Sequence, residues 1–274
     1  MLKWRSDKML KSIAYLLLFI LYAFTLFTVV ATAELVGYEN FLRSMTQENG
    51  VFETLSVLFL FSISFYGVYT LYFFRKKFSK YLYILILFTS FLTFLAGMEE
   101  MSWGQHLFHF SSTDYFVENN LQQETNLHNF MDANLFSSLI YTSIYTLFVF
   151  IPLLSKLFFK DVPLLRYFDL NMHHILIILF SSTLQLYFYP DFGVYVDMFT
   201  QLLALALFGF VLWKEEYSPR LFVHYLLVVN TTIIFMLYHD VFDFLNMQYE
   251  IREMFVTLAV LFIFIDFIQK EKVK

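Results

Sequence analysis

Two short polar strings carry most of the side chains that could do chemistry: MEEMSWGQ at residues 98–105 and NNLQQETNLHN at residues 119–129. Glu99 and Glu100 end a long apolar run, where carboxylates normally face a protein interior and pair with another group. Residues 81–155 contain no Lys or Arg. The available partners for these two acids are therefore a metal ion, a proton, a histidine or amide donors.

The aromatic and amide side chains after these acids could complete a pocket. If the helix continues past Glu100, Trp103 lies four residues after Glu99 and on the same side of the helix. Gln105 follows half a turn later. The structural alternative is that the two acids mark a membrane–water interface, where Trp103 would be an aromatic anchor.

Two His–Asp pairs have the spacing of neighbours on one helix face: His128 with Asp132, and His239 with Asp243. This spacing suits two metal ligands, or a histidine oriented by a carboxylate. The same pattern also occurs in helix capping, so both interpretations stay open. Glu53 lies one turn into another apolar run, where the helix dipole alone would favour an acid.

Together these residues predict an outward-facing polar site at the membrane surface. The assigned residues are catalytic Glu99, Glu100, His128 and His239; substrate-binding Trp103, Gln105, Glu53 and Asn129; and metal-binding Glu100, His128, Asp132, His239 and Asp243. The expected cofactor is an unidentified divalent metal: zinc would activate water, and calcium would suit an oxygen-rich site. No HExxH or GxSxG string is present to decide the reaction.

The elements that must position this site are membrane helices. The 274 residues are 59% hydrophobic and 15% charged, against about 45–50% and about 25% in soluble domains. The apolar runs are continuous and too long for the alternating strands of a membrane barrel. The chain has no Cys, which excludes disulfides, thiolate metal sites and cysteine nucleophiles.

The sequence predicts an all-α, polytopic membrane helix bundle forming a single domain over residues 1–274. Eight spans are expected near residues 13–33, 51–74, 81–98, 135–158, 173–189, 194–213, 221–238 and 254–268, each near the length needed to cross a bilayer. The first run is long for a signal peptide, which favours a retained span. The stretch between the third and fourth spans is expected to lie along the membrane or re-enter it.

Basic residues alternate with the expected spans. Of the 18 Lys and Arg residues, 16 fall in segments on one side, and only Arg43 and Arg252 fall on the other. By the positive-inside rule both termini are expected in the cytoplasm, and the expected location is a bacterial inner membrane. The expected partner is the lipid bilayer. The few basic clusters lie beside spans, and nothing resembles a nucleic-acid-binding module.

The polar strings resemble those of an uncharacterised family of bacterial polytopic membrane proteins. Its members carry a GEE-(I/M)-SWGQ string followed by an N-x-Q-x-E-x-N-LHN string. Residues 98–105 match the first string except that Met98 replaces its Gly, and residues 120–129 match the second. An E-(N/D)-G-x-x-E turn before the second span is matched by residues 48–53. The resemblance covers a small part of the chain. It implies a shared polar site and brings no known activity.

A more distant similarity is to the alkaline ceramidase-like (CREST) intramembrane hydrolases. The spacing of Ser102 and His106 is similar to their Ser…His spacing. That family would imply seven spans and a zinc ion held by three histidines with Ser and Asp. Here Asp243 stands opposite His239 where a closing histidine is expected, and the span count differs.

The resulting hypothesis is a metal-dependent, membrane-embedded hydrolase acting on a lipid or lipid-linked substrate. One alternative is a cation- or proton-coupled transporter or channel, for which the same acids would line a path. Another is a non-catalytic membrane subunit that binds a partner through its outer face. The sequence leaves the substrate, the metal and the oligomeric state open.

Overall fold

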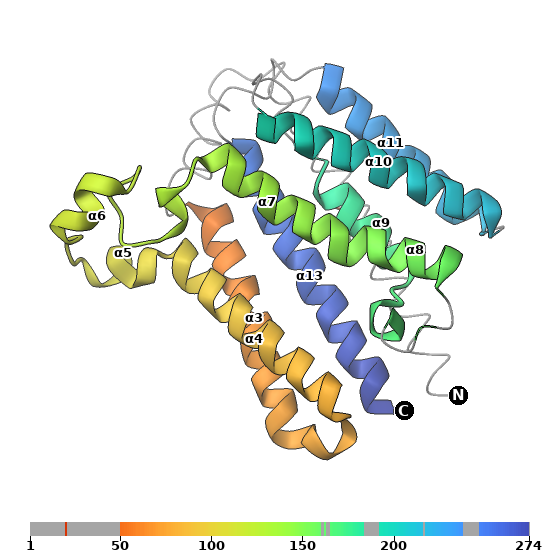
Figure 1. The fold of residues 1–274 in the computed structure, drawn as a ribbon, viewed down its shortest axis with the longest axis horizontal. Helices are drawn as coiled ribbons and strands as arrows, with labels where there is room; N and C mark the ends of the chain where they lie inside the picture. Colours follow the sequence, from red (N-terminus) through yellow and green to blue (C-terminus); the bar gives the residue numbers. More distant parts are fainter. Residues whose placement is uncertain are drawn as a thin grey trace. The chain divides into compact units, whose positions relative to one another are not determined.

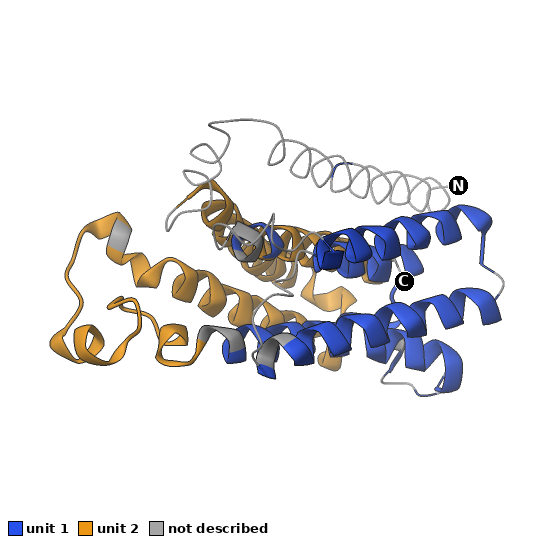
Figure 2. Ribbon diagram, turned by 90° about the horizontal axis from the view of Figure 1, so that it is seen from above, with its two compact units in different colours: residues 1–43, 134–252 blue, residues 44–133, 253–274 orange. Residues whose placement is uncertain are grey.

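The computed structural model describes residues 20, 50–159, 162, 165–183, 192–215, 217–237 and 247–273. Every regular element within these ranges is a helix, as the composition predicted (Figure 1). The chain divides into two compact units. Unit 1 comprises residues 1–43 and 134–252, and unit 2 comprises residues 44–133 and 253–274 (Figure 2).

Unit 2 is built on a helical hairpin. Helix α3 (Val51–Phe74) and helix α4 (Lys80–Glu100) are joined by a short 3₁₀ turn, η1 (Arg75–Lys77). Ser79 caps α4, because its hydroxyl accepts a hydrogen bond from the Leu82 amide at 3.3 Å. The two helices pack closely at Gly67, where a Cβ atom would lie 2.0 Å from the Ser90 hydroxyl.

Helix α13 (Met247–Val273) is continuous, and from Glu253 onward it belongs to unit 2. Its C-terminal half packs on α3, where the Gln269 amide donates a hydrogen bond to the Tyr66 hydroxyl at 2.7 Å. The Phe264 ring lies edge-on to Tyr66. The buried Asp266 pairs with Lys270 one turn later, at 2.6 Å.

Unit 1 contains a longer series of helices. They are α7 (Ala133–Tyr145), the π-helical turn η4 (Thr146–Phe150), α8 (Ile151–Phe158), the 3₁₀ turn η5 (Leu165–Phe168), α9 (Met172–Ser181), α10 (Phe192–Lys214) and α11 (Pro219–Leu237). All ten residues of α9 are buried. It packs against η4, α10 and α11, so α9 forms the core of this unit.

Among the described residues, five helical stretches are long and apolar enough to cross a membrane. They are Val51–Lys77, Lys80–Glu100, Leu135–Phe158, Tyr195–Lys214 and Pro219–Leu237, and each matches an expected span. Large apolar side chains along the first two are exposed, among them Phe65, Phe88 and Phe91. Such extended apolar surfaces suit lipid contact rather than water.

The other three expected spans differ from what the structure describes or lie outside it. The run at residues 13–33 lies outside the described residues, apart from Ile20. Helix α9 ends after ten residues, so it is shorter than the span expected over 173–189. The run at 254–268 lies inside α13, which does not count among the five. The number eight therefore stays a prediction.

Candidate functional site

The two polar strings lie in one segment, the α4–α7 connection (residues 101–132). Helix α4 ends at Glu100, and the next residues reverse the chain through positive φ angles: 46° at Ser102, 53° at Trp103 and 85° at Gly104. Short elements follow: α5 (Gln105–Phe108), α6 (Asp114–Asn119) and the 3₁₀ turn η3 (His128–Phe130). Two non-glycine residues at positive φ store backbone strain, so neighbouring contacts must hold this turn in place.

Gly104 shows why the turn needs a glycine. At its φ of 85° an L side chain is strained, and a Cβ atom there would lie 3.0 Å from the Phe108 ring. The ring therefore lies directly over the turn. The left-handed turn ends the helix, which corrects the expectation of a helical Glu99–Trp103 pair.

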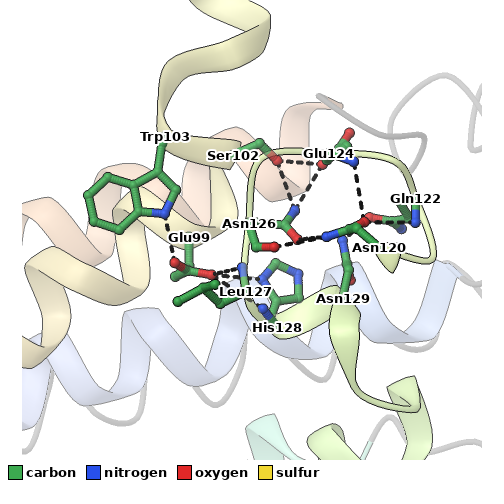
Figure 3. A network of polar contacts seen from close by, with 10 residues as sticks. All are labelled: Glu99, Ser102, Trp103, Asn120, Gln122, Glu124, Asn126, Leu127, His128 and Asn129. Atoms are coloured by element: carbon green, nitrogen blue, oxygen red, sulfur yellow. Dashed lines mark hydrogen bonds and ion pairs between the residues drawn. The ribbon is translucent and has the colours of Figure 1, made fainter. Parts of the chain in front are cut away.

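Glu99 anchors both strings. Its carboxylate accepts hydrogen bonds from the Trp103 indole at 2.7 Å, the Leu127 amide at 2.6 Å and the His128 amide at 3.3 Å (Figure 3). The left-handed turn after α4, and not a continued helix, thus places Trp103 beside Glu99. Charge-assisted bonds of this kind are stronger than neutral ones, so Glu99 ties the end of α4 to the second string.

Ser102 joins the strings a second time. Its buried hydroxyl donates to the Glu124 carboxylate and accepts from the Asn126 amide at 2.9 Å. The Asn126 amide group also donates to Glu124 at 3.0 Å. Asn120 donates to the Asn126 side-chain oxygen at 2.9 Å, and its own oxygen accepts from the Gln122 amide at 2.9 Å. These polar groups satisfy one another inside the segment (Figure 3).

Gln105 and Asn129, both expected to contact substrate, also hold the segment together. The Gln105 side-chain oxygen accepts from the Thr125 amide at 2.7 Å and from the Ser112 hydroxyl at 3.1 Å. The Asn129 amide group donates to the Gln122 side chain, and the Asn129 carbonyl accepts from the Leu121 amide at 3.0 Å. The motif residues therefore act on each other and on the local backbone.

His128 lies beside the anchoring carboxylate, with 3.7 Å between its Nδ1 atom and Glu99 Oε2. Burial lowers the pKa of His128 below its ordinary value, and this outweighs the opposing effect of the Glu99 carboxylate. At neutral pH the pair is thus a carboxylate next to a neutral imidazole. That arrangement orients the ring and could support proton transfer.

The remaining predicted site residues are less closely gathered. Glu100 is the half-buried last residue of α4, and Glu53 lies in the first turn of α3, where the helix dipole favours it. Asp132 is exposed and follows an extended Met131, because η3 ends at Phe130. The expectation that His128 and Asp132 share a helix face is therefore wrong.

The expected metal centre is not assembled in the part of the chain that the structure describes. No group of three or more His, Asp or Glu side chains there could hold a metal ion. His239 and Asp243, the other two expected ligands, lie outside the described residues. The metal therefore stays a prediction.

Large apolar side chains of the connection are exposed around this polar network. Trp103 is 40% exposed, Leu107 64% and Phe108 72%, although all three lie within one short stretch. Further exposed side chains of the connection are Phe110, Tyr115, Val117, Leu121 and Leu127. The segment thus combines a polar interior with a surface on which large apolar side chains lie exposed beside polar ones such as Asp114 and Glu118.

A second polar centre, in unit 1, was missed by sequence reasoning. Arg252 and Asp197 are buried, with 3.6 Å between Arg252 Nη1 and Asp197 Oδ2. The guanidinium also donates to the Ser137 hydroxyl at 2.7 Å and lies 3.5 Å from the centroid of the Tyr141 ring. The sequence had counted Arg252 as a loop charge. The available signal was its position two residues before the apolar run expected at 254–268.

Comparisons of this chain with protein-family models, curated proteins and solved structures found no match.

Proposed function

We propose that this chain is a multi-pass inner-membrane protein that binds a lipid or lipid-linked ligand at its outer face, through the α4–α7 connection. Both termini are cytoplasmic in this proposal, which the uneven distribution of basic residues supports. The observation that carries the proposal is the construction of the connection: its buried polar side chains bind each other, and many of its large apolar side chains are exposed.

The physical argument rests on where apolar surface is stable. A segment held by internal hydrogen bonds does not need its exposed leucines and phenylalanines for folding. In water those side chains would cost free energy, at roughly 25 cal/mol per Å² of apolar surface. Against acyl chains they cost little. Because α4 is apolar enough to cross a membrane and ends where the connection begins, lipid chains are the nearest apolar partner.

The test uses the full chain in nanodiscs that contain phosphatidylethanolamine with a diazirine in one acyl chain. After irradiation, mass spectrometry of peptides should find label on residues 103–121, and an excess of unlabelled lipid should reduce it. Leu107→Gln combined with Leu121→Gln should lower that labelling several-fold. Phe88→Gln, which changes an exposed side chain of α4, is the matched control and should leave it unchanged.

Absence of label from the connection, with strong label on α3 and α4, would contradict lipid binding there. It would favour the third hypothesis, a surface for a protein partner.

Hydrolysis of the same ligand is a second candidate function, because the Glu99 carboxylate adjoins His128. A neutral imidazole beside a carboxylate is the arrangement of a general base. The metal-dependent form of this candidate uses Glu100, His128 and Asp132, with His239 and Asp243 as further ligands. The labelled lipid serves as the readout: cleavage products in the wild type that disappear in His128→Gln support hydrolysis, and intact lipid in both counts against it.

A further inference from the structure

The opposite end of the α3–α4 hairpin gathers positive charge from two distant parts of the sequence. We call this the basic end; its members are Arg75, Lys76, Lys77, Lys80, Lys270 and Lys272. The Lys77 ammonium donates to the Lys272 carbonyl at 3.2 Å, which joins the hairpin turn to the end of α13. Figure 1 shows both at the same end of unit 2.

The positive charge of the basic end exceeds the nearby negative charge. The acids on the last turns of α13 are Asp266 and Glu271, and Asp266 is buried against Lys270. Burial and the neighbouring Lys77 charge both lower the pKa of Lys272. The Lys272 ammonium lies 4.2 Å from the Phe74 ring centroid and 5.3 Å from that of Tyr66. Because like charges held this close repel one another, binding of an anion at the basic end is favourable.

Exposed aromatic side chains beside the basic end indicate which class of anion lies near it. Tyr72 is 78% exposed and Tyr81 is 74% exposed, on either side of the basic turn. Phe73 and Tyr69 are exposed beside them. Tyrosines at the end of an apolar helix favour the headgroup level of a bilayer, so the lysines just beyond them reach the depth of lipid phosphates.

We propose that the basic end binds the phosphate headgroup of an anionic phospholipid. Exposed Lys76 and Lys80 supply charge to the phosphate, Tyr72 and Tyr81 contact the region below it, and Lys77 holds α13 in place beside the turn. The positive-inside rule explains why these charges stay on one side of the membrane. It does not explain why folding brings Lys272 to the α3–α4 turn. This inference goes beyond the proposed function and concerns the other end of unit 2.

Native mass spectrometry of the full chain in detergent tests the proposal. The chain is titrated with phosphatidylglycerol and, separately, with phosphatidylcholine. The anionic lipid should bind about tenfold more tightly, since each basic residue near a lipid surface adds roughly 1 kcal/mol. Lys76→Gln with Lys80→Gln should remove most of that preference, and Lys76→Arg with Lys80→Arg should keep it.

The matched control removes two exposed charges at the facing ends of α10 and α11 in the sequence, with Lys214→Gln and Arg220→Gln. It should keep the preference for phosphatidylglycerol. Equal binding of the two lipids by the wild type would overturn the proposal, as would an equal loss in the control. Complete displacement of the lipid by inorganic phosphate would also overturn it. Unchanged unfolding midpoints show that the variants remain folded.

Discussion

Two buried polar centres in the described part of the chain differ in construction. The network of the α4–α7 connection joins groups at most 29 positions apart, and it surrounds the Glu99 and Glu124 carboxylates with backbone amide, side-chain amide and hydroxyl groups. The centre in unit 1 joins Arg252 to Ser137 across 115 positions, and it rests on a full ion pair with Asp197. The first centre shapes a segment; the second joins helices.

This difference predicts different consequences of losing one member. A buried ion pair is costly to break, because removing one charge leaves the other without compensation in a medium of low dielectric constant. The network of the connection spreads its hydrogen bonds over many members, and each contributes a modest net amount. Removing one member of the centre in unit 1 should therefore lower the free energy of unfolding of the whole protein. Removing one member of the network in the connection should increase the opening of that segment alone.

The largest effect is expected from Arg252→Met. This variant leaves the buried Asp197 carboxylate without its cation and should lower the free energy of unfolding by about 3–5 kcal/mol. The measurement is the unfolding midpoint of the purified protein in detergent. Arg252→Met with Asp197→Leu should recover most of the loss.

Arg220→Met, at an exposed position of α11, is the matched control and should change little. If Arg252→Met is as stable as the wild type, the ion pair does not hold α7, α10 and α13 together, and the contrast between the two centres fails.

An intermediate effect is expected from Glu99→Gln. The amide keeps one acceptor oxygen and brings its own N–H groups toward the Leu127 and His128 amides. Loss of charge-assisted bonds of this type costs about 1.5–3 kcal/mol. Hydrogen exchange should accelerate across residues 121–132, while exchange in α3 and α4 should stay unchanged.

Glu118→Gln, at an exposed position of α6, should leave all of these rates unchanged. Acceleration throughout unit 2 in Glu99→Gln would show that the connection supports the hairpin, contrary to the division between a shaping centre and a joining centre.

The sequence predicted the long helices, because long apolar runs with few Gly or Pro residues leave few alternatives. Prediction from the sequence failed where a hydrogen bond or an ion pair joins residues that are far apart in the chain. Ser102 and Asn126 are 24 positions apart, and no local pattern shows that one accepts from the other. Without that contact, the polar strings looked like a site for an external ligand.

The assignment of Arg252 to a loop was wrong for a related reason. A charge near the end of an apolar run is assigned to a loop by default, and its burial depends on Asp197, 55 positions earlier in the chain. The prediction from the spacing of His128 and Asp132 was wrong for a local reason. The 3₁₀ turn η3 has three residues, so it ends before the two side chains could share a helix face. Spacing carries information only where the helix continues.

The smallest effect concerns pH and distinguishes the two centres by their titration. Burial lowers the pKa of His128 in the folded connection, so the unfolded segment binds a proton more readily than the folded one. The His128 contribution to stability should be constant above about pH 6.5, the ordinary histidine pKa. It should fall as the pH drops from there through the folded pKa.

Exchange of residues 121–132, corrected for intrinsic rates, should therefore quicken between pH 7 and pH 5. In His128→Gln the rates should not depend on pH, and the unfolding midpoint of unit 1 should not follow this change in either protein. A wild-type connection whose opening is independent of pH would contradict this prediction, because it would mean that burial of His128 does not outweigh the effect of the neighbouring Glu99 carboxylate.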